Sequence, residues 1–260
     1  MKQIESKKQP VSLYSVEHGQ GIPIILLHGF PFNHSIWNNL VPSLAVRARL
    51  ICPDLRGHGK SSTPEDSFQM EDLAGDVHEL MVNRSIDQAI LVGHSMGGYV
   101  SLAFLESFPE KCLGLILVAS HASADTGEKR EGRFATISKL ENQDLAGVAD
   151  SMTKILSDSH EIQQDLRSMI LSTPIPSLIG CLRGMAERPD RSGLVKMLKI
   201  PILIIAGEND KILPVESAKK LSAQAKNARL VVIPGAGHMP MLEKPEQMIQ
   251  PIDEFFAQFQ

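Results

Sequence analysis

The strongest constraint on the fold is a repeated alternation between short, nearly continuous apolar segments and longer amphipathic segments. Apolar runs without polar alternation are typical of strands buried on both faces, as in a parallel sheet flanked by helices. The pattern therefore predicts an α/β fold with a mostly parallel central sheet flanked by helices. The predicted strands are residues 23–28, 49–53, 88–93, 113–119, 202–207 and 229–233.

Amphipathic helices are predicted between these strands. Residues 70–84 place their apolar side chains on one stripe, as a helix that packs on a sheet requires. A carboxy-terminal helix is predicted over residues 245–259, where Pro251 is expected to kink the helix or to begin a second one.

One long stretch interrupts the alternation. Residues 121–200 contain no strand-like run, and a connection of this length must carry structure of its own. Apolar residues recur at helical spacing from Leu145 onward, and a further helix is predicted over residues 177–188. We expect a helical cap at 121–200, inserted before the strand at 202–207, and a core domain formed by residues 1–120 and 201–260.

Composition excludes several classes of protein. The chain of 260 residues has 43% hydrophobic and 22% charged residues, which is typical of a globular protein and not of a disordered chain. Its formal net charge is −4 and no basic run is longer than a pair, so we expect no nucleic-acid partner. No apolar run approaches the roughly 18 residues of a membrane span, and residues 1–10 lack the apolar stretch of a targeting signal.

The cysteines indicate a reducing environment. The three cysteines are an odd number and lack the spacing of a disulfide framework or a zinc site. We therefore expect a cytoplasmic protein without a metal or other cofactor, and nothing in the sequence indicates its oligomeric state. These cysteines are Cys52, Cys112 and Cys181.

The segment at residues 89–100 carries the most informative motif. It reads Ala-Ile-Leu-Val-Gly-His-Ser-Met-Gly-Gly-Tyr-Val, a strand that continues through Gly-x-Ser-x-Gly into a helix. Gly93 and Gly97 remove the Cβ atoms that a sharp strand-to-helix turn would force together, which leaves the Ser95 hydroxyl exposed at the carboxyl end of the sheet. The spacing alone is a weak signal, but its position between a predicted strand and a predicted helix supports a nucleophilic serine.

A nucleophilic serine needs a base, and the base needs an orienting carboxylate. His238 follows the last predicted strand in a glycine-rich loop, and Asp210 follows the preceding strand. Because the carboxyl ends of parallel strands meet at one edge of a sheet, we expect Ser95, Asp210 and His238 to converge there. The order serine, aspartate, histidine differs from the trypsin-like and subtilisin-like orders.

Backbone N–H groups are the expected stabilisers of the oxyanion that forms when the serine attacks a carbonyl. Met96, the residue after the nucleophile, supplies one N–H group. The loop that follows the first predicted strand, Leu26-Leu27-His28-Gly29-Phe30-Pro31, supplies the second, which we assign to Phe30. The residues expected to contact the substrate are Phe30, His121 and Met239.

Other polar residues near these motifs allow a structural interpretation. Asp210 could instead cap a helix ahead of Pro214, with Glu208 or Asp125 as the acid. Three histidines are expected to pack beside the motifs or to shape a loop, and not to bind a metal: His28, His58 and His94. A turn and an ion pair are the expected roles of Asp54, Arg56 and Ser61.

Five segments together resemble the α/β-hydrolase fold superfamily. The resemblance covers nearly the whole chain except the predicted cap, and within the superfamily the chain is similar to serine esterases and lactonases of the 3-oxoadipate enol-lactonase type. Haloalkane dehalogenases and epoxide hydrolases share His-Gly-Phe-Pro but carry aspartate in place of the serine of the Gly-x-Ser-x-Gly turn. Ser95 therefore argues against both of these enzyme classes. The segments are 28–31 (His-Gly-Phe-Pro), 53–61 (Pro-Asp-Leu-Arg-Gly-His-Gly-Lys-Ser), 93–97, 207–210 with Pro214, and 235–238 (Gly-Ala-Gly-His).

The resemblance implies a cofactor-independent serine hydrolase that cleaves small-molecule carboxylic esters, thioesters or lactones through an acyl-enzyme on Ser95. The alternatives are a C–C bond hydrolase, a cofactor-free perhydrolase and a ligand receptor that retains the triad. We expect no Arg or Lys fixed beside the triad motifs, which favours a small or medium acyl group over a dianionic substrate. Arg183 or Arg188 of the predicted cap would reverse this preference by pointing inward.

Overall fold

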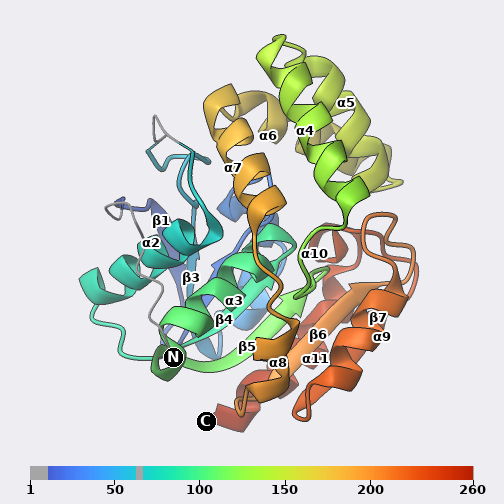
Figure 1. The fold of residues 1–260 in the computed structure, drawn as a ribbon. Helices are drawn as coiled ribbons and strands as arrows, with labels where there is room; N and C mark the ends of the chain where they lie inside the picture. Colours follow the sequence, from blue (N-terminus) through green and yellow to red (C-terminus); the bar gives the residue numbers. More distant parts are fainter. Residues whose placement is uncertain (1–10, 63–66, 260) are drawn as a thin grey trace.

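A computed structural model describes residues 11–62 and 67–259, so the predicted absence of a targeting signal at residues 1–10 lies outside the described part. Its centre is a seven-stranded sheet with the order β1-β3-β2-β4-β5-β6-β7 (Figure 1). β1 pairs antiparallel with β3, and every other neighbouring pair is parallel, so the predicted mostly parallel sheet is confirmed. The strands are β1 (Ser15–His18), β2 (Ile22–Leu27), β3 (Ala48–Pro53), β4 (Ala89–His94), β5 (Cys112–Val118), β6 (Ile202–Gly207) and β7 (Ala228–Ile233).

The edge strand β1 is the one strand of the described residues that the apolar pattern did not predict. Its sequence is Ser-Val-Glu-His, and none of these residues is fully buried. A short edge strand pairs on one side only and needs no continuous apolar run, so it gives no signal of the kind used for the central strands.

The strand order reverses at β2, which fixes the position of a ligand site. The chain passes from β2 to β3 on one side and later reaches β4 on the other side of β2. Leu27 and Gly93 are partners at the carboxyl ends of β2 and β4. In open α/β sheets, ligands bind in the crevice that opens outside the carboxyl ends at such a reversal.

Helices cover both faces of the sheet because successive strand residues point to opposite sides. Leu91 and Leu115 lie in one apolar cluster with the helices of one face, whereas Ile90 and Ile116 lie in a second cluster with the helices of the other. The first face carries α2 (Met70–Asn83), α3 (Met96–Ser107) and α9 (Val215–Gln224). The second carries the short helices η1 (His34–Trp37) and α1 (Val41–Leu44) and the long α11 (Pro245–Phe256).

Four helices between β5 and β6 stand as a group beyond the sheet (Figure 1) and are called the cap below. α4 packs on α7 and α5 packs on α6, and the segment then returns to the core through α8 (Ser192–Met197), which contacts α9. All residues between β5 and β6 are described, and none of them forms a strand. The cap helices are α4 (Gly127–Glu141), α5 (Leu145–Leu156), α6 (His160–Ser172) and α7 (Ile175–Glu187).

At Pro251 the structure contradicts one of the two alternatives expected, and the cap contains a helix that was not predicted. α11 runs unbroken from Pro245 to Phe256 with Pro251 inside it, so no second helix starts at this proline. The buried apolar face of α11 holds the helix together and compensates for the missing N–H group. α4 was not predicted, because only Ile137 and Leu140 of its fifteen residues are buried and the apolar pattern is weak.

Among the helices of residues 11–62 and 67–259, no single one is long and apolar enough to span a bilayer. The helices α6 and α7, which meet at an angle of 102°, reach the required length and composition only together.

Two short 3-10 helices and one further α-helix complete the described part of the chain. They are η2 (Pro109–Lys111), η3 (Ala257–Phe259) and α10 (Pro240–Glu243).

Candidate active site

Ser95 occupies a strained turn between β4 and α3. Its backbone has φ 49° and ψ −111°, a conformation that L-residues rarely adopt outside a site whose surroundings enforce it. A Cβ atom on Gly93 would lie 2.5 Å from the Gly97 carbonyl, and one on Gly97 would lie 2.2 Å from the Leu27 carbonyl. Both glycines are therefore required for the turn to pack against itself and against β2.

Ser95, His238 and Asp210 form a continuous hydrogen-bonded chain. Ser95 Oγ lies 3.0 Å from His238 Nε2, and His238 Nδ1 lies 2.8 Å from Asp210 Oδ2. The side chains of His238 and Asp210 are buried, at 3% and 1% exposure. In this geometry Nδ1–H donates to the carboxylate and Nε2 is free to accept the serine proton.

The loops that carry the acid and the base are held by the backbone. Asp210 Oδ1 accepts the N–H groups of Ile212 and Leu213, each at 2.8 Å, which fixes the carboxylate plane. The N–H group of His238 donates to the carbonyl of Leu156 in the cap helix α5 at 3.2 Å. The position of the histidine therefore depends on the cap as well as on the core.

His94, which precedes Ser95, connects the serine turn to the histidine loop. Its Nε2 lies 2.9 Å from the His238 carbonyl, and since a carbonyl only accepts, Nε2 carries the proton. Burial lowers the pKa of His94 well below its ordinary value, so this imidazole is neutral. His94 thus acts as a fixed donor that positions the loop of His238.

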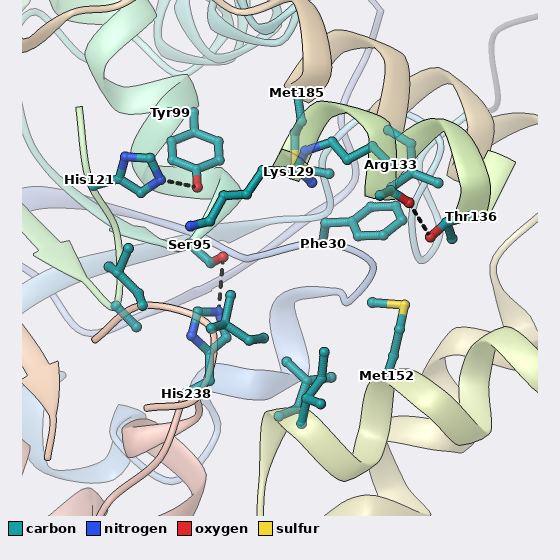
Figure 2. A pocket seen from close by; sticks show the side chains of 17 residues that line it. Phe30, Ser95, Tyr99, His121, Lys129, Arg133, Thr136, Met152, Met185 and His238 are labelled. Carbon is teal, nitrogen blue, oxygen red and sulfur yellow. Dashed lines mark hydrogen bonds between the residues drawn. The ribbon is translucent and has the colours of Figure 1, made fainter. Parts of the chain in front are cut away.

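The two backbone N–H groups assigned to the oxyanion are available. Met96 is the first residue of α3, so its N–H group has no partner within the helix. Phe30 lies in the turn after β2, and its N–H group donates to no atom of the described residues. The Phe30 ring faces the same cavity as Ser95 (Figure 2).

The other acids considered for the triad lie elsewhere. Asp125 pairs with Arg133 and Arg188, and Glu208 accepts the N–H group of Gly235 at 2.9 Å. Neither contacts His238, so the geometry places Asp210 in the position of the orienting acid.

The residues expected to have structural roles hold the loop after β3. Arg56 forms a fully buried ion pair with Asp76 at 2.5 Å. The Ser61 hydroxyl donates to the Asp54 carbonyl at 2.6 Å, and the Asp54 carboxylate accepts the N–H group of Lys60.

Two further histidines support the same loop. Burial is the main reason that the pKa falls to about 4 for His28 and to about 3 for His58, so both are neutral. His28 Nε2 accepts the N–H group of Leu55, which links the oxyanion loop to this segment. Among residues 11–62 and 67–259, no group of three His, Cys, Asp or Glu side chains could hold a metal ion.

A cavity of about 250 Å³ opens at Ser95 between the core and the cap. Phe30 and His121 line it as expected, whereas Met239 is fully buried in the core cluster that contains α11 and is not part of its lining. Most of the wall is apolar and comes from the cap and from loops of the core: Met152, Ile155, Leu156, Leu182, Met185, Ile212 and Leu213.

The sequence patterns did not predict that charged side chains line this cavity. Lys129 and Arg133 line it from α4 (Figure 2), contrary to the expectation that no cation stands near the triad. Together with Gly132 and Thr136 they occupy positions i, i+3, i+4 and i+7, which share one face of a helix. This spacing could have indicated the lining, but only once α4 was recognised as a helix.

The two cap arginines do not line the cavity. Arg183 is exposed and pairs with Glu141. Arg188 is buried behind the wall, where it pairs with Asp125 and lies 3.9 Å above the Tyr99 ring. It supports the side chains of the cavity wall without entering the cavity.

Comparison with known proteins places these features in a family. A family model described as the alpha/beta hydrolase fold matches residues 22–245. An esterase from Thermogutta terrifontis, solved with malate bound, is 32% identical with a TM-score of 0.93, and the match covers 97% of this chain and 96% of that chain.

Two further comparisons agree with this assignment. A pimeloyl-[acyl-carrier protein] methyl ester esterase from Aeromonas hydrophila is 31% identical, over 93% of this chain and 98% of its own length. The enol-lactonase from Burkholderia xenovorans shares the fold, with 22% identity, a TM-score of 0.87 and coverage of 94% and 96% of the two chains. Because the family model spans most of the chain, the protein belongs to the alpha/beta hydrolase fold family.

Proposed function

We propose that the protein is a serine hydrolase that cleaves carboxylic esters, thioesters or lactones through an acyl-enzyme on Ser95. The observation that carries this proposal is the hydrogen-bonded chain from Ser95 through His238 to Asp210, whose serine faces a cavity. The esterases that are 31% and 32% identical over nearly the whole chain support ester bonds as the target.

Acylation begins when the Ser95 hydroxyl attacks the carbonyl carbon of the ester. His238 Nε2, at 3.0 Å from Oγ, takes the proton, and Asp210 stabilises the imidazolium that forms. The N–H groups of Phe30 and Met96 bind the oxyanion of the tetrahedral intermediate. His238 then returns the proton to the departing alcohol oxygen, and the acyl group remains on Ser95.

Deacylation repeats these steps with water. His238 takes a proton from a water molecule, which attacks the acyl carbonyl, and the second oxyanion uses the same two N–H groups. The proton passes to Ser95 Oγ as the carboxylic acid leaves. No group outside the described site is needed for either half of the reaction.

The size of the cavity indicates the size of the substrate. At about 250 Å³ the cavity is slightly smaller than the roughly 300–1,000 Å³ that is typical of ligand pockets. The apolar side chains from α5 and α7 suit a short alkyl or acyl chain beside the reacting carbonyl. We therefore expect preference for short or medium acyl groups.

The test is hydrolysis of p-nitrophenyl esters of graded acyl length by the parent protein, by Ser95→Ala and by Ser168→Ala. Ser168 is exposed on α6 and is the matched control. We expect turnover with an optimum at short chains, its loss in Ser95→Ala alone, and labelling of Ser95 by a fluorophosphonate. Turnover that survives in Ser95→Ala would refute the mechanism, and labelling of Ser95 without turnover of any ester would refute ester hydrolysis.

A further inference from the structure

The cavity at Ser95 contains an ammonium group that has no partner among residues 11–62 and 67–259. Figure 2 shows the Lys129 side chain reaching from α4 into the cavity toward Ser95 and His121. The backbone N–H group of Lys129 donates to Thr126, but its Nζ forms no hydrogen bond or ion pair with the residues that the structure describes. By contrast, lysines such as Lys111, Lys211 and Lys219 each pair with a carboxylate.

The positive charge of Lys129 acts on its surroundings. His121 Nε2 lies 3.1 Å from the Tyr99 hydroxyl and 3.4 Å from a guanidinium nitrogen of Arg188, so this nitrogen accepts. The pKa of His121 falls to about 3, mainly through burial and further through the nearby charges of Arg188 and Lys129. His121 is therefore neutral and adds no charge to the wall.

Acidic residues near the cavity do not compensate for these cations. Asp125 is shared between Arg133 and Arg188, so this group retains one net positive charge before Lys129 is counted. Asp190 accepts the N–H group of Ser192 and lies outside the lining. No Asp or Glu side chain lines the cavity, whose charged lining consists of Lys129 and Arg133 among the described residues.

A second hollow adjoins the cavity at Ser95 and contains a further positively charged side chain. It measures about 310 Å³ and shares His121, Lys129 and Leu213 with the cavity at Ser95. Its remaining wall mixes polar residues, Lys220 among them, with the apolar Ala122, Ala124 and Leu221, and no Asp or Glu of the described residues lines it. Lys129 thus lies where the mostly apolar cavity that contains Ser95 meets a hollow whose charged lining residues are both lysines.

We propose that the substrate is an ester that carries a carboxylate group, and that Lys129, with Arg133 beside it, binds this carboxylate while the ester carbonyl lies at Ser95. This inference rests on the ester hydrolysis proposed above and adds the charge of the substrate. It revises the preference for a small or medium acyl group over a dianionic substrate, which assumed that no Arg or Lys is fixed beside the triad motifs. A carboxylate fits because it pairs with a lysine ammonium group, and the apolar part of the cavity accommodates the carbon chain between the two ends.

The test compares esters that differ only in charge. The acyl arm uses monomethyl adipate and its neutral carboxamide analogue, and the alcohol arm uses butyryloxyacetate and butyryloxyacetamide. For each pair the measured quantity is the ratio of kcat/KM for the carboxylate over that for the carboxamide. The arm with the higher ratio shows whether the carboxylate belongs to the acyl or to the alcohol part.

Variants of Lys129 assign the preference to this residue. Lys129 is exposed, and an exposed ion pair is worth up to about 1 kcal/mol, which corresponds to about a fivefold loss of the ratio in Lys129→Met. Lys129→Arg keeps the charge and should retain most of the preference. Lys139→Met removes an exposed lysine from the same helix that lines neither cavity, and should leave the ratio as in the parent.

Salt gives an independent readout, because the preference should shrink as ionic strength rises and screens the ammonium group. Ratios near one in both arms, or ratios that Lys129→Met does not change, would overturn the inference. If the inference fails but the parent protein still hydrolyses neutral p-nitrophenyl esters in a Ser95-dependent way, the proposed function stands. If the parent protein hydrolyses none of these esters, the proposed function itself is refuted.

Discussion

Replacing Asp210 with asparagine tests the triad with almost no change in shape. In the structure Oδ1 accepts two backbone N–H groups, those of Ile212 and Leu213, and Oδ2 accepts the Nδ1–H group of His238. An asparagine side chain has one acceptor oxygen and one NH2 group. If the oxygen stays with the two backbone donors, the NH2 group faces Nδ1, which must become an acceptor. The imidazole proton then moves to Nε2 and faces Ser95, so His238 cannot act as a base.

The geometry gives the size of the effect. An active arrangement needs the amide turned over, which leaves the N–H groups of Ile212 and Leu213 facing a donor. Each buried unpaired donor costs about 1–3 kcal/mol, so the active orientation lies about 2–6 kcal/mol above the inactive one. At about 1.4 kcal/mol per factor of ten, kcat should fall between roughly 30-fold and 2 × 10⁴-fold. The corresponding substitution in a serine protease lowers kcat about 10⁴-fold, within this range.

The assay is kcat for p-nitrophenyl acetate with the parent protein, Asp210→Asn and Asp87→Asn. Asp87 has a side chain that is 88% exposed, so it receives the same chemical change away from the site. Circular dichroism and thermal unfolding establish that each variant is folded. A folded Asp210→Asn protein whose kcat falls by less than about threefold would refute the tautomer argument.

Three further predictions concern stability. Asp125→Ala leaves Arg188, whose side chain is 2% exposed, without its carboxylate partner. The free energy of unfolding measured in urea should therefore fall by about 3–5 kcal/mol, and a decrease below about 1 kcal/mol would contradict this. Gly97→Ala places a Cβ atom 2.2 Å from the Leu27 carbonyl and should sharply lower the thermal midpoint, unlike Gly127→Ala, which meets open space. Stability should also fall in acid, because burial lowers the pKa of four buried histidines below the unfolded value of 6.5, to about 4 for His28, to about 3 for His58 and His121, and well below 6.5 for His94. Below pH 6.5 the unfolded chain binds more protons than the folded protein, so the free energy of unfolding should fall as the pH drops. Each of these histidines contributes up to about 1.4 kcal/mol for each pH unit. A free energy of unfolding that stays constant between pH 7 and pH 5 would contradict this.

Much of the architecture follows from local sequence alone. The central strands are apolar on both faces, and such runs can only be buried in a sheet covered on two sides, so the pattern predicted them without knowledge of their neighbours. The turn at Ser95 can also be recognised locally, because Gly93 packs against Gly97 only four residues away, although Gly97 is required by its contact with the Leu27 carbonyl of β2. The acid and base could be placed because parallel strands end at the same edge of the sheet.

What the tertiary structure decided is the choice among residues whose local sequence is similar. Asp125 and Asp210 are both aspartates that follow a core strand, but Asp125 lies against Arg133 and Arg188 whereas Asp210 meets His238. Lys129 is a polar residue on a weakly amphipathic helix, and nothing in its own sequence shows that α4 turns this face toward Ser95. Such contacts join segments far apart in the chain, and they depend on how helices pack and not on the order of residues within each helix. The sequence by itself therefore determined the sheet and the turn at Ser95, and the packing of the cap determined the charge of the cavity that Ser95 faces.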